Sequence, residues 1–204
     1  MNDYFANFGN HSKICVFAFA SGDCAKFEWK DTLDRLGVNY ILFRDHTDRW
    51  YTQGVAGVGN VSVTVNYMRL VSFQYSRCLT LGLSKGAYAA LMYGYLAKIR
   101  EIIAISPVTG LSYETYPDFD PKWHHRLEHV RTDYKVDDLK PLFRSNTYEP
   151  MVHAFISDGD GAELDHTMCT RIGVEPILIP GHTHEALGAV VRDTGMVDKI
   201  IRGQ

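Results

Sequence analysis

Apolar residues along this chain fall into short continuous runs that alternate with longer stretches of mixed character. A short apolar run bounded by turn residues is typical of a strand buried on both faces of a sheet. Such runs predict strands at residues 14–20, 38–43, 78–81, 101–105, 151–156 and 175–179. The intervening stretches predict helices at residues 27–36, 61–75, 85–97, 162–172 and 185–192. Strands that alternate with helices predict an α/β protein with a doubly wound, mostly parallel sheet.

Local signals mark some ends of these elements, and two regions break the alternation. Gly37 is expected to cap one helix at its C-terminus, and Asn60 to cap the next at its N-terminus. Residues 1–12 have no regular pattern and are expected to form a loose lead-in. Residues 106–149 are rich in aromatic residues and turn signals, and are expected to form a lid or insertion with short helices. The alternative for this region is a surface elaboration that covers a sheet edge.

Length and composition are those of a globular protein, and they do not indicate which reaction, if any, it catalyses. A length of 204 residues predicts a single domain, residues 1–204. The formal net charge of −3 gives no reason to expect a nucleic-acid or membrane partner, and no stretch is apolar for long enough to span a bilayer. The N-terminus lacks the pattern of a secretory signal, so a cytoplasmic location is expected. The cysteines form no C-x-x-C pair and are expected to be reduced: Cys15, Cys24, Cys78 and Cys169.

The most informative stretch runs from Gly82 to Gly86 and has the pattern G-x-S-x-G between a predicted strand and a predicted helix. A sharp strand-to-helix turn holds its central residue at a strained backbone conformation, so the flanking positions must be nearly free of side chain. Ser84 is that central residue, and its hydroxyl is expected to be exposed to a base. The alternative is an ordinary glycine-rich turn.

A serine hydroxyl needs a base, and the base is oriented by a carboxylate. Two later strand-end loops supply both residue types, at residues 157–161 and 180–184. The acid candidates are Asp160 and Asp158, and the base candidates are His184 and His182. Because the carboxyl ends of parallel strands lie at one edge of a sheet, these side chains are expected to meet Ser84 there.

The order Ser, Asp, His, with the glycine-flanked serine, resembles the α/β-hydrolase-fold serine hydrolases in a compact, bacterial esterase-like form. The resemblance runs from about residue 14 to the end of the chain. It implies a three-layer sandwich and a Ser-His-Asp triad. The usual strand-end pattern of the fold, Gly-x-x-Asp, selects Asp160 over Asp158, because Ser157 takes the place of the glycine. His184 is favoured over His182 because it directly precedes the last helix, where the backbone is fixed.

An oxyanion hole is expected from two backbone N–H groups. Lys85 supplies one, directly after the nucleophile, and Ala20 or Ser21 supplies the other from the loop after the first predicted strand. The Lys85 side chain is expected to point to solvent, and the alternative is that its ammonium adds positive potential near the site.

Two further clusters allow a functional and a structural interpretation. The loop at residues 44–51 offers Arg44 or Arg49 to an anionic substrate and Trp50 or Tyr51 for stacking, or it is a salt-bridged surface loop. The cluster His124, His125 and His129 has the spacing of a helical metal site, but a solvated helix face accounts for it more simply.

The sequence therefore predicts a serine hydrolase that cleaves a carboxylic ester, with a small-molecule or glycan ester as substrate. No cofactor or metal is expected. The alternatives are an acyltransferase to a glycan or other hydroxyl acceptor, and a non-catalytic binding module on the same fold. Composition does not indicate the oligomeric state.

Overall fold

A computed structural model describes residues 2–22, 26–111, 137–145, 147–159 and 162–204. The strands are β1 (Tyr4–Asn7), β2 (Ile14–Phe19), β3 (Asn39–Phe43), β4 (Arg77–Leu83), β5 (Glu101–Ile105), β6 (Met151–Ser157) and β7 (Ile177–Ile179). The helices are α1 (Lys30–Leu36), α2 (Val61–Ser72), α3 (Lys85–Ala97), α5 (Lys140–Arg144), α6 (Ala162–Arg171), α7 (His184–Asp193) and α8 (Met196–Arg202). Every strand and helix predicted from the pattern is present, with ends that shift by a few residues.

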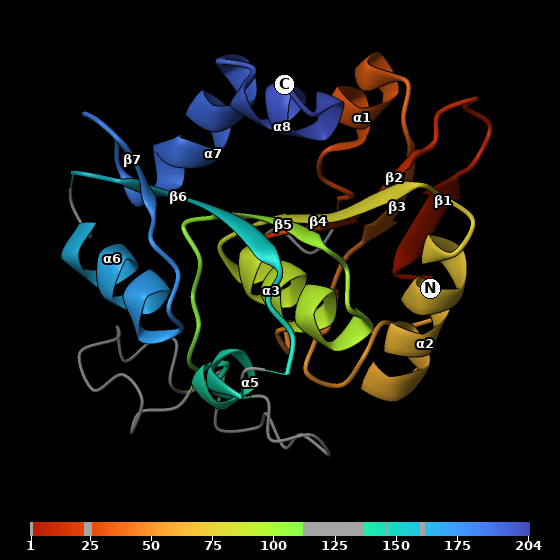
Figure 1. The fold of residues 1–204 in the computed structure, drawn as a ribbon, viewed down its shortest axis with the longest axis horizontal. Helices are drawn as coiled ribbons and strands as arrows, with labels where there is room; N and C mark the ends of the chain where they lie inside the picture. The colour runs from red at the N-terminus through yellow and green to blue at the C-terminus, as the bar shows by residue number, and fades with distance from the viewer. Residues whose placement is uncertain (1, 23–25, 112–136, 146, 160–161) are drawn as a thin grey trace.

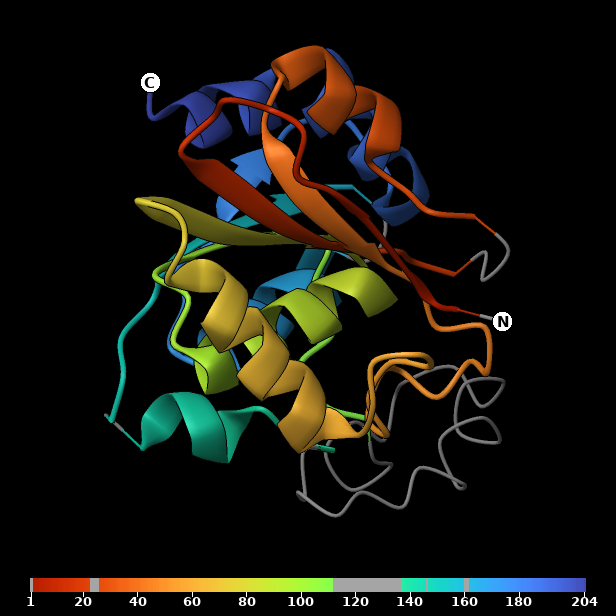
Figure 2. The ribbon, with the colours of Figure 1, turned by 90° about the vertical axis from the view of Figure 1, so that its right-hand side faces the viewer.

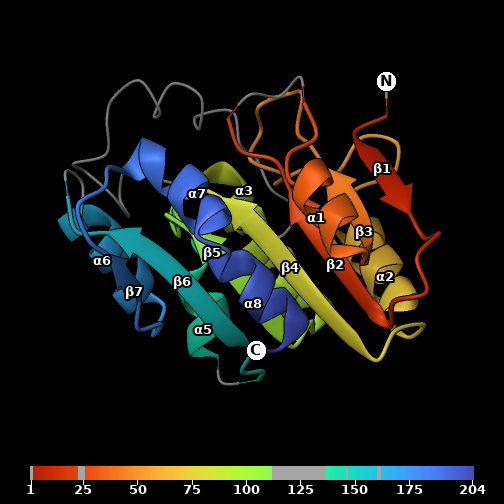
Figure 3. The ribbon, with the colours of Figure 1, turned by 90° about the horizontal axis from the view of Figure 1, so that it is seen from above.

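The strands form one sheet in the order β1-β3-β2-β4-β5-β6-β7, which is parallel except for β1. Helices α1, α7 and α8 cover one face, while α2, α3, α5 and α6 cover the other (Figures 1 and 2). The view onto the first face shows α7 and α8 lying across β4, β5 and β6 (Figure 3). The predicted doubly wound, mostly parallel sheet is therefore confirmed.

Strand β2 shows why the apolar runs are continuous. Cys15, Phe17 and Phe19 face the layer of α2 and α3, whereas Val16 and Ala18 face the layer of α1 and α8. Side chains alternate between the two faces of a strand, so a strand covered on both faces needs apolar residues at every position. Because the side chains on both faces of the strand are buried, only the end of the strand and the loop that follows it remain exposed.

Two expectations about the N-terminal part of the chain are wrong. Residues 4–7 are not a loose lead-in but the edge strand β1, which pairs antiparallel with β3 from Tyr4 opposite Phe43 to Asn7 opposite Tyr40. The first helix begins at Lys30 rather than at residue 27, because Trp29 has a left-handed backbone with φ of 69°. Residues 26–29 instead form a connection in which Glu28 binds Ser21, as described below.

Two predicted helix caps are confirmed, and the chain has one further helix near its C-terminus. Gly37, with φ of 65°, ends α1, and the Asn60 side chain accepts a hydrogen bond from the Val63 N–H at the start of α2, as predicted. Helix α8, which the pattern did not reveal, packs Val197 and Ile201 onto the sheet. Most of the expected lid, residues 112–136, lies outside the described residues, so its role stays a prediction.

Candidate active site

Ser84 occupies the turn between β4 and α3 with φ of 51° and ψ of −114°. A non-glycine residue with this backbone is strained and persists only where its surroundings impose it. A Cβ on Gly82 would lie 2.1 Å from the Gly86 carbonyl oxygen, and a Cβ on Gly86 would lie 2.3 Å from the Phe19 carbonyl oxygen. Both glycines are therefore required by close backbone contacts, as the G-x-S-x-G pattern predicts.

The loop after β2 lies against the start of α3, so the two regions expected to supply oxyanion donors are neighbours. The virtual Cβ of Gly86 lies 3.1 Å from the Ala20 carbonyl carbon, which belongs to the peptide that carries the Ser21 N–H. Lys85 is the first residue of α3, and N–H groups of a first helical turn point out of the helix terminus. The backbone thus brings the Ala20–Ser21 and Ser84–Lys85 peptides to one place.

The Ser21 loop has a partner that the sequence pattern did not indicate. The Ser21 N–H donates to Glu28 Oε2 at 3.0 Å, and Ser21 Oγ donates to Glu28 Oε1 at 2.6 Å. The Glu28 carboxylate therefore takes the N–H that the sequence assigns to an oxyanion. An oxyanion that binds this group has to replace the carboxylate.

The side chain of Lys85 does not point to solvent, so that expectation is wrong. Lys85 is 2% exposed, and its Nζ lies 3.0 Å from Asp48 Oδ1 and 3.8 Å from Asp45 Oδ2. The first turn of α3 packs against the loop at residues 45–51, and carboxylates from that loop compensate the buried ammonium.

The acidic loop after β6 and the histidine loop after β7 are in contact. Asp158 Oδ1 accepts a hydrogen bond of 2.5 Å from the Gly181 N–H, and a Cβ on Gly159 would lie 2.3 Å from the His182 carbonyl oxygen. The contact follows from the parallel pairing of β6 with β7, in which Ser157 lies opposite Ile179. Asp160, the favoured acid, lies outside the described residues.

Helix α7 carries the histidine loop to the end of β4. Its first residue is His184, and the Thr183 side chain caps it by accepting a hydrogen bond of 3.4 Å from the Ala186 N–H. Gly188, one turn later, packs so closely on β4 that a Cβ would lie 2.5 Å from Leu83 Cδ2. The N-terminus of α7 is therefore close to the Ser84 turn. The His184 side chain lies outside the described part of the structure, so the choice of His184 or His182 as base, and of Asp160 or Asp158 as acid, stays a prediction.

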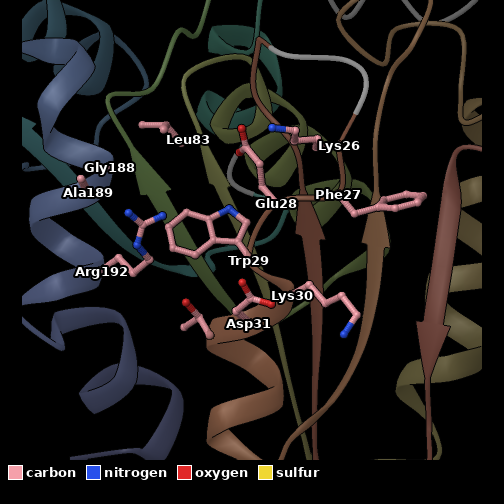
Figure 4. A pocket seen from close by; sticks show the side chains of 11 residues that line it. Lys26, Phe27, Glu28, Trp29, Lys30, Asp31, Leu83, Gly188, Ala189 and Arg192 are labelled. Atoms are coloured by element: carbon pink, nitrogen blue, oxygen red, sulfur yellow. The ribbon is translucent and has the colours of Figure 1, made fainter.

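A cavity of about 770 Å³ opens between residues 26–32, Leu83 and helix α7 (Figure 4). The Trp29 side chain lies between Glu28 and Arg192 in this cavity (Figure 4). Its Nε1 is buried and has no hydrogen-bond partner among the described residues. Leu83, which directly precedes Ser84 in the chain, is among the residues that line the cavity. None of Glu28, Trp29 and Arg192 was predicted as a site residue. Glu28 and Trp29 lie in a connection, which carries no periodic signal, and Arg192 lies in the last turn of α7, where the pattern predicts only a helix.

The structure contradicts the stacking role expected of Trp50 and Tyr51 in the loop at residues 44–51, while anion binding by the exposed Arg49 stays a prediction. Trp50 and Tyr51 are each 1% exposed and have no free face for stacking on a sugar. The Arg44 Nε lies 3.1 Å from Asp3 Oδ1, and its guanidinium lies 4.7 Å from the centroid of the Phe27 ring. The exposed Arg49 donates to Gln53 Oε1 at 2.6 Å.

The other candidate chemistries find little support in the described residues. Cys15, Cys78 and Cys169 form no disulfide, and burial raises the pKa of the Cys169 thiol to about 12. Cys24 and the cluster His124, His125 and His129 lie outside the described residues. Within the described part of the chain, no group of three or more His, Cys, Asp and Glu side chains is placed to bind a metal. No described helix is both long enough and apolar enough to cross a bilayer.

Comparison with known proteins supports the fold and leaves the activity open. No family model matches the chain, and no curated protein matches it in sequence. Among solved structures, the capsule O-acetyltransferase of Neisseria meningitidis serogroup A matches with a TM-score of 0.65 at 15% identity, over 98% of this chain and 90% of that one.

Two further matches cover both chains almost completely. A structure of the metagenome-derived lipolytic enzymes LipS and LipT matches with a TM-score of 0.62 at 13% identity, over 100% of this chain and 98% of that one. MenH from S. aureus matches with a TM-score of 0.60 at 14% identity, over 100% and 97%. The chain therefore has the α/β-hydrolase fold, as the resemblance in its sequence implies.

Proposed function

We propose that this protein is a serine hydrolase that cleaves a carboxylic ester through Ser84. The observation that carries the proposal is the strained Ser84 turn at the end of the central strand β4. Strain at a single residue with a hydroxyl side chain is a recurring feature of functional sites. The contact of Gly188 with Leu83, and the contact of the acidic loop with the histidine loop, support the presence of a base and an acid nearby.

In the proposed reaction, Ser84 Oγ attacks the acyl carbonyl carbon while His184, or His182, accepts the serine proton. Asp160, or Asp158, orients the imidazole and stabilises its charged form. The N–H groups of Lys85 and Ser21 stabilise the oxyanion of the tetrahedral intermediate. The imidazole then protonates the leaving alcohol, and water hydrolyses the acyl-enzyme by the same steps. The cavity that contains Trp29 is the proposed site for the substrate.

The test combines covalent labelling with turnover of a short-chain nitrophenyl ester. The wild-type protein is expected to react with a fluorophosphonate probe at Ser84 and to hydrolyse the ester. Ser84→Ala should abolish labelling and lower kcat by about 10³-fold or more, because no other group replaces the nucleophile.

Ser106 offers a matched control for this test. It is also a strand-end serine with a positive φ, 44°, and its hydroxyl is fully buried without a partner among the described residues. Ser106→Ala is expected to keep the labelling and most of the turnover. Turnover that survives in Ser84→Ala would contradict the proposal, and a wild-type protein with neither labelling nor turnover would favour the binding module.

An acyltransferase is the second candidate, and it shares the Ser84 chemistry. The structural match to a capsule O-acetyltransferase, which includes a complex of that enzyme with CoA, favours testing it. In this case a hydroxyl acceptor replaces water in the second half of the reaction. Adding polyols or oligosaccharides to the ester assay would distinguish the two, because an acyltransferase forms acylated acceptor at the expense of free acid.

A further inference from the structure

We propose that Tyr51 is a positioning residue for the oxyanion-binding backbone, an inference that rests on the proposed function. Tyr51 is 1% exposed, and its Oη donates a hydrogen bond of 2.8 Å to the Ala20 carbonyl oxygen. That carbonyl and the Ser21 N–H belong to the same peptide unit. In a trans peptide the two groups point in opposite directions, so holding the carbonyl from behind fixes the direction of the N–H.

The loop that carries Tyr51 is itself held tightly. The Tyr93 hydroxyl donates to the Tyr51 carbonyl oxygen at 2.8 Å, and the Tyr51 N–H donates to Asp45 Oδ2 at 3.3 Å. Asp48, Trp50 and Tyr51 all have positive φ values, of 53°, 55° and 59°. Backbone strain at several non-glycine residues persists only where the surrounding contacts determine the conformation. The position of the Tyr51 hydroxyl is therefore imposed by its surroundings.

The same loop also binds the other predicted donor residue. Lys85 Nζ donates to Asp48 Oδ1 at 3.0 Å, and the Lys85 side chain is buried against the loop. One loop thus contacts the Ala20–Ser21 peptide through Tyr51 and the Lys85 side chain through Asp48. We call these two contacts the brace, because they connect the two segments that carry the proposed oxyanion donors.

The consequence for catalysis is specific. An oxyanion is stabilised by donors placed 2.7–3.1 Å from its final position, and the carbonyl oxygen of the unreacted substrate forms weaker hydrogen bonds with the same donors. Loss of the Tyr51 hydroxyl removes the hydrogen bond that holds the Ala20 carbonyl, so the Ser21 N–H is misdirected once an oxyanion replaces Glu28. Binding of the uncharged substrate in the cavity does not depend on this N–H. The expected effect is therefore on kcat and not on KM.

The experiment compares Tyr51→Phe, which removes one oxygen and keeps the ring, with the wild-type protein in the nitrophenyl ester assay. We expect kcat to fall by about ten- to a hundredfold, less than for deletion of a donor, with KM within about twofold. The affinity for phenylboronic acid, which forms a tetrahedral adduct with a reactive serine, should fall in parallel with kcat.

Tyr40→Phe is the matched control. Tyr40 is equally buried, its hydroxyl donates to Asp34 Oδ1 at 2.5 Å, and it packs in the layer of α1 and α8. It should lose stability to a similar degree and keep the wild-type kcat. If Tyr51→Phe does not fold, Tyr93→Phe tests the same brace through the Tyr51 carbonyl, with a smaller expected loss in kcat.

The outcomes separate this inference from the proposed function. Two results would overturn the positioning role alone, provided that the wild-type protein shows Ser84-dependent turnover. One is an unchanged kcat in a folded Tyr51→Phe, and the other is a kcat loss of the same size in Tyr40→Phe. A wild-type protein without Ser84-dependent turnover overturns both.

Discussion

At the scale of single residues, the contact between Glu28 and Ser21 is the detail of the site with the clearest consequence. Both oxygens of the Glu28 carboxylate accept hydrogen bonds from Ser21, one from the N–H and one from the hydroxyl. A carboxylate is a strong acceptor, and its negative charge opposes the formation of an oxyanion in the same place. In the proposed reaction, Glu28 therefore competes with the transition state for the Ser21 N–H.

The Glu28→Gln variant tests this competition. A neutral amide keeps an acceptor for Ser21 but binds it more weakly and carries no charge, so kcat/KM for the ester should rise by about three- to tenfold. Asp31→Asn is the control, since Asp31 lines the same cavity and is exposed. A fall in kcat/KM for Glu28→Gln that the control does not share would show that Glu28 supports the Ser21 loop instead of competing for it.

At the scale of elements, the junction of β4 with α3 depends on small residues and one buried charge. Helix α3 is almost entirely buried, and Gly94 lies so close to the sheet that a Cβ would be 2.8 Å from Thr80 Oγ1. At its first turn Lys85 binds Asp48 and lies near Asp45, and neither the lysine nor Asp45 is more than 5% exposed in its side chain. Removing one partner of a buried ion pair leaves the other charge uncompensated.

We expect Lys85→Met to lower the free energy of unfolding by about 3–5 kcal/mol, measured by urea denaturation. Lys199→Met, at an exposed position of α8, should change it by less than about 0.5 kcal/mol. Adding Asp48→Asn to Lys85→Met should restore part of the loss, because it removes a carboxylate that has lost its ammonium partner. An unfolding curve for Lys85→Met that overlies the wild type would show that the ion pair contributes nothing to stability.

At the scale of the whole molecule, the C-terminal helix α8 is joined to the sheet through a polar cluster at the amino ends of β4 and β5. Arg77 of β4 donates to Glu101 of β5 at 2.8 Å and to the carbonyl oxygens of Ile200 and Ile201 at 2.6 Å and 2.7 Å. One arginine therefore holds neighbouring strands and the end of α8. His153 of β6 lies near this cluster, where burial lowers the pKa of its imidazole below the usual value and Glu101 partly opposes the shift.

This lowered pKa predicts how the stability of the whole fold depends on pH. Because the unfolded chain binds the His153 proton more readily, the contribution of His153 to stability is complete above about pH 6.5, the ordinary histidine pKa. It is lost as the pH falls from there through the folded-state pKa. His153→Gln should therefore lose less stability than the wild type between pH 8 and pH 5.5, as judged by urea midpoints. His11→Gln, at an exposed position, is the control, and identical pH profiles for His153→Gln and wild type would contradict the prediction.

The sequence by itself determined the strands from β2 to β7, the helices between them and the turn at Ser84, because these depend on local rules. Apolar runs such as residues 101–105 mark buried strands, and the spacing of Gly82 and Gly86 around Ser84 marks a tight strand-to-helix turn. The parallel order of the strands followed from the alternation with helices. Parallel strands place the loops after β6 and β7 at one edge of the sheet, where the Gly181 N–H donates to Asp158. The meeting of an acid and a histidine from these loops with Ser84 stays a prediction.

Only the tertiary structure decided which polar side chains are buried and what they bind. Trp50 and Tyr51 lie in a polar loop and Lys85 lies at the first turn of α3, and the packing of that loop against α3 buries all three. Glu28 binds Ser21, and Tyr51 binds Ala20 across 31 residues of sequence. Such contacts depend on the packing of distant segments, and no periodic pattern in the sequence records that packing.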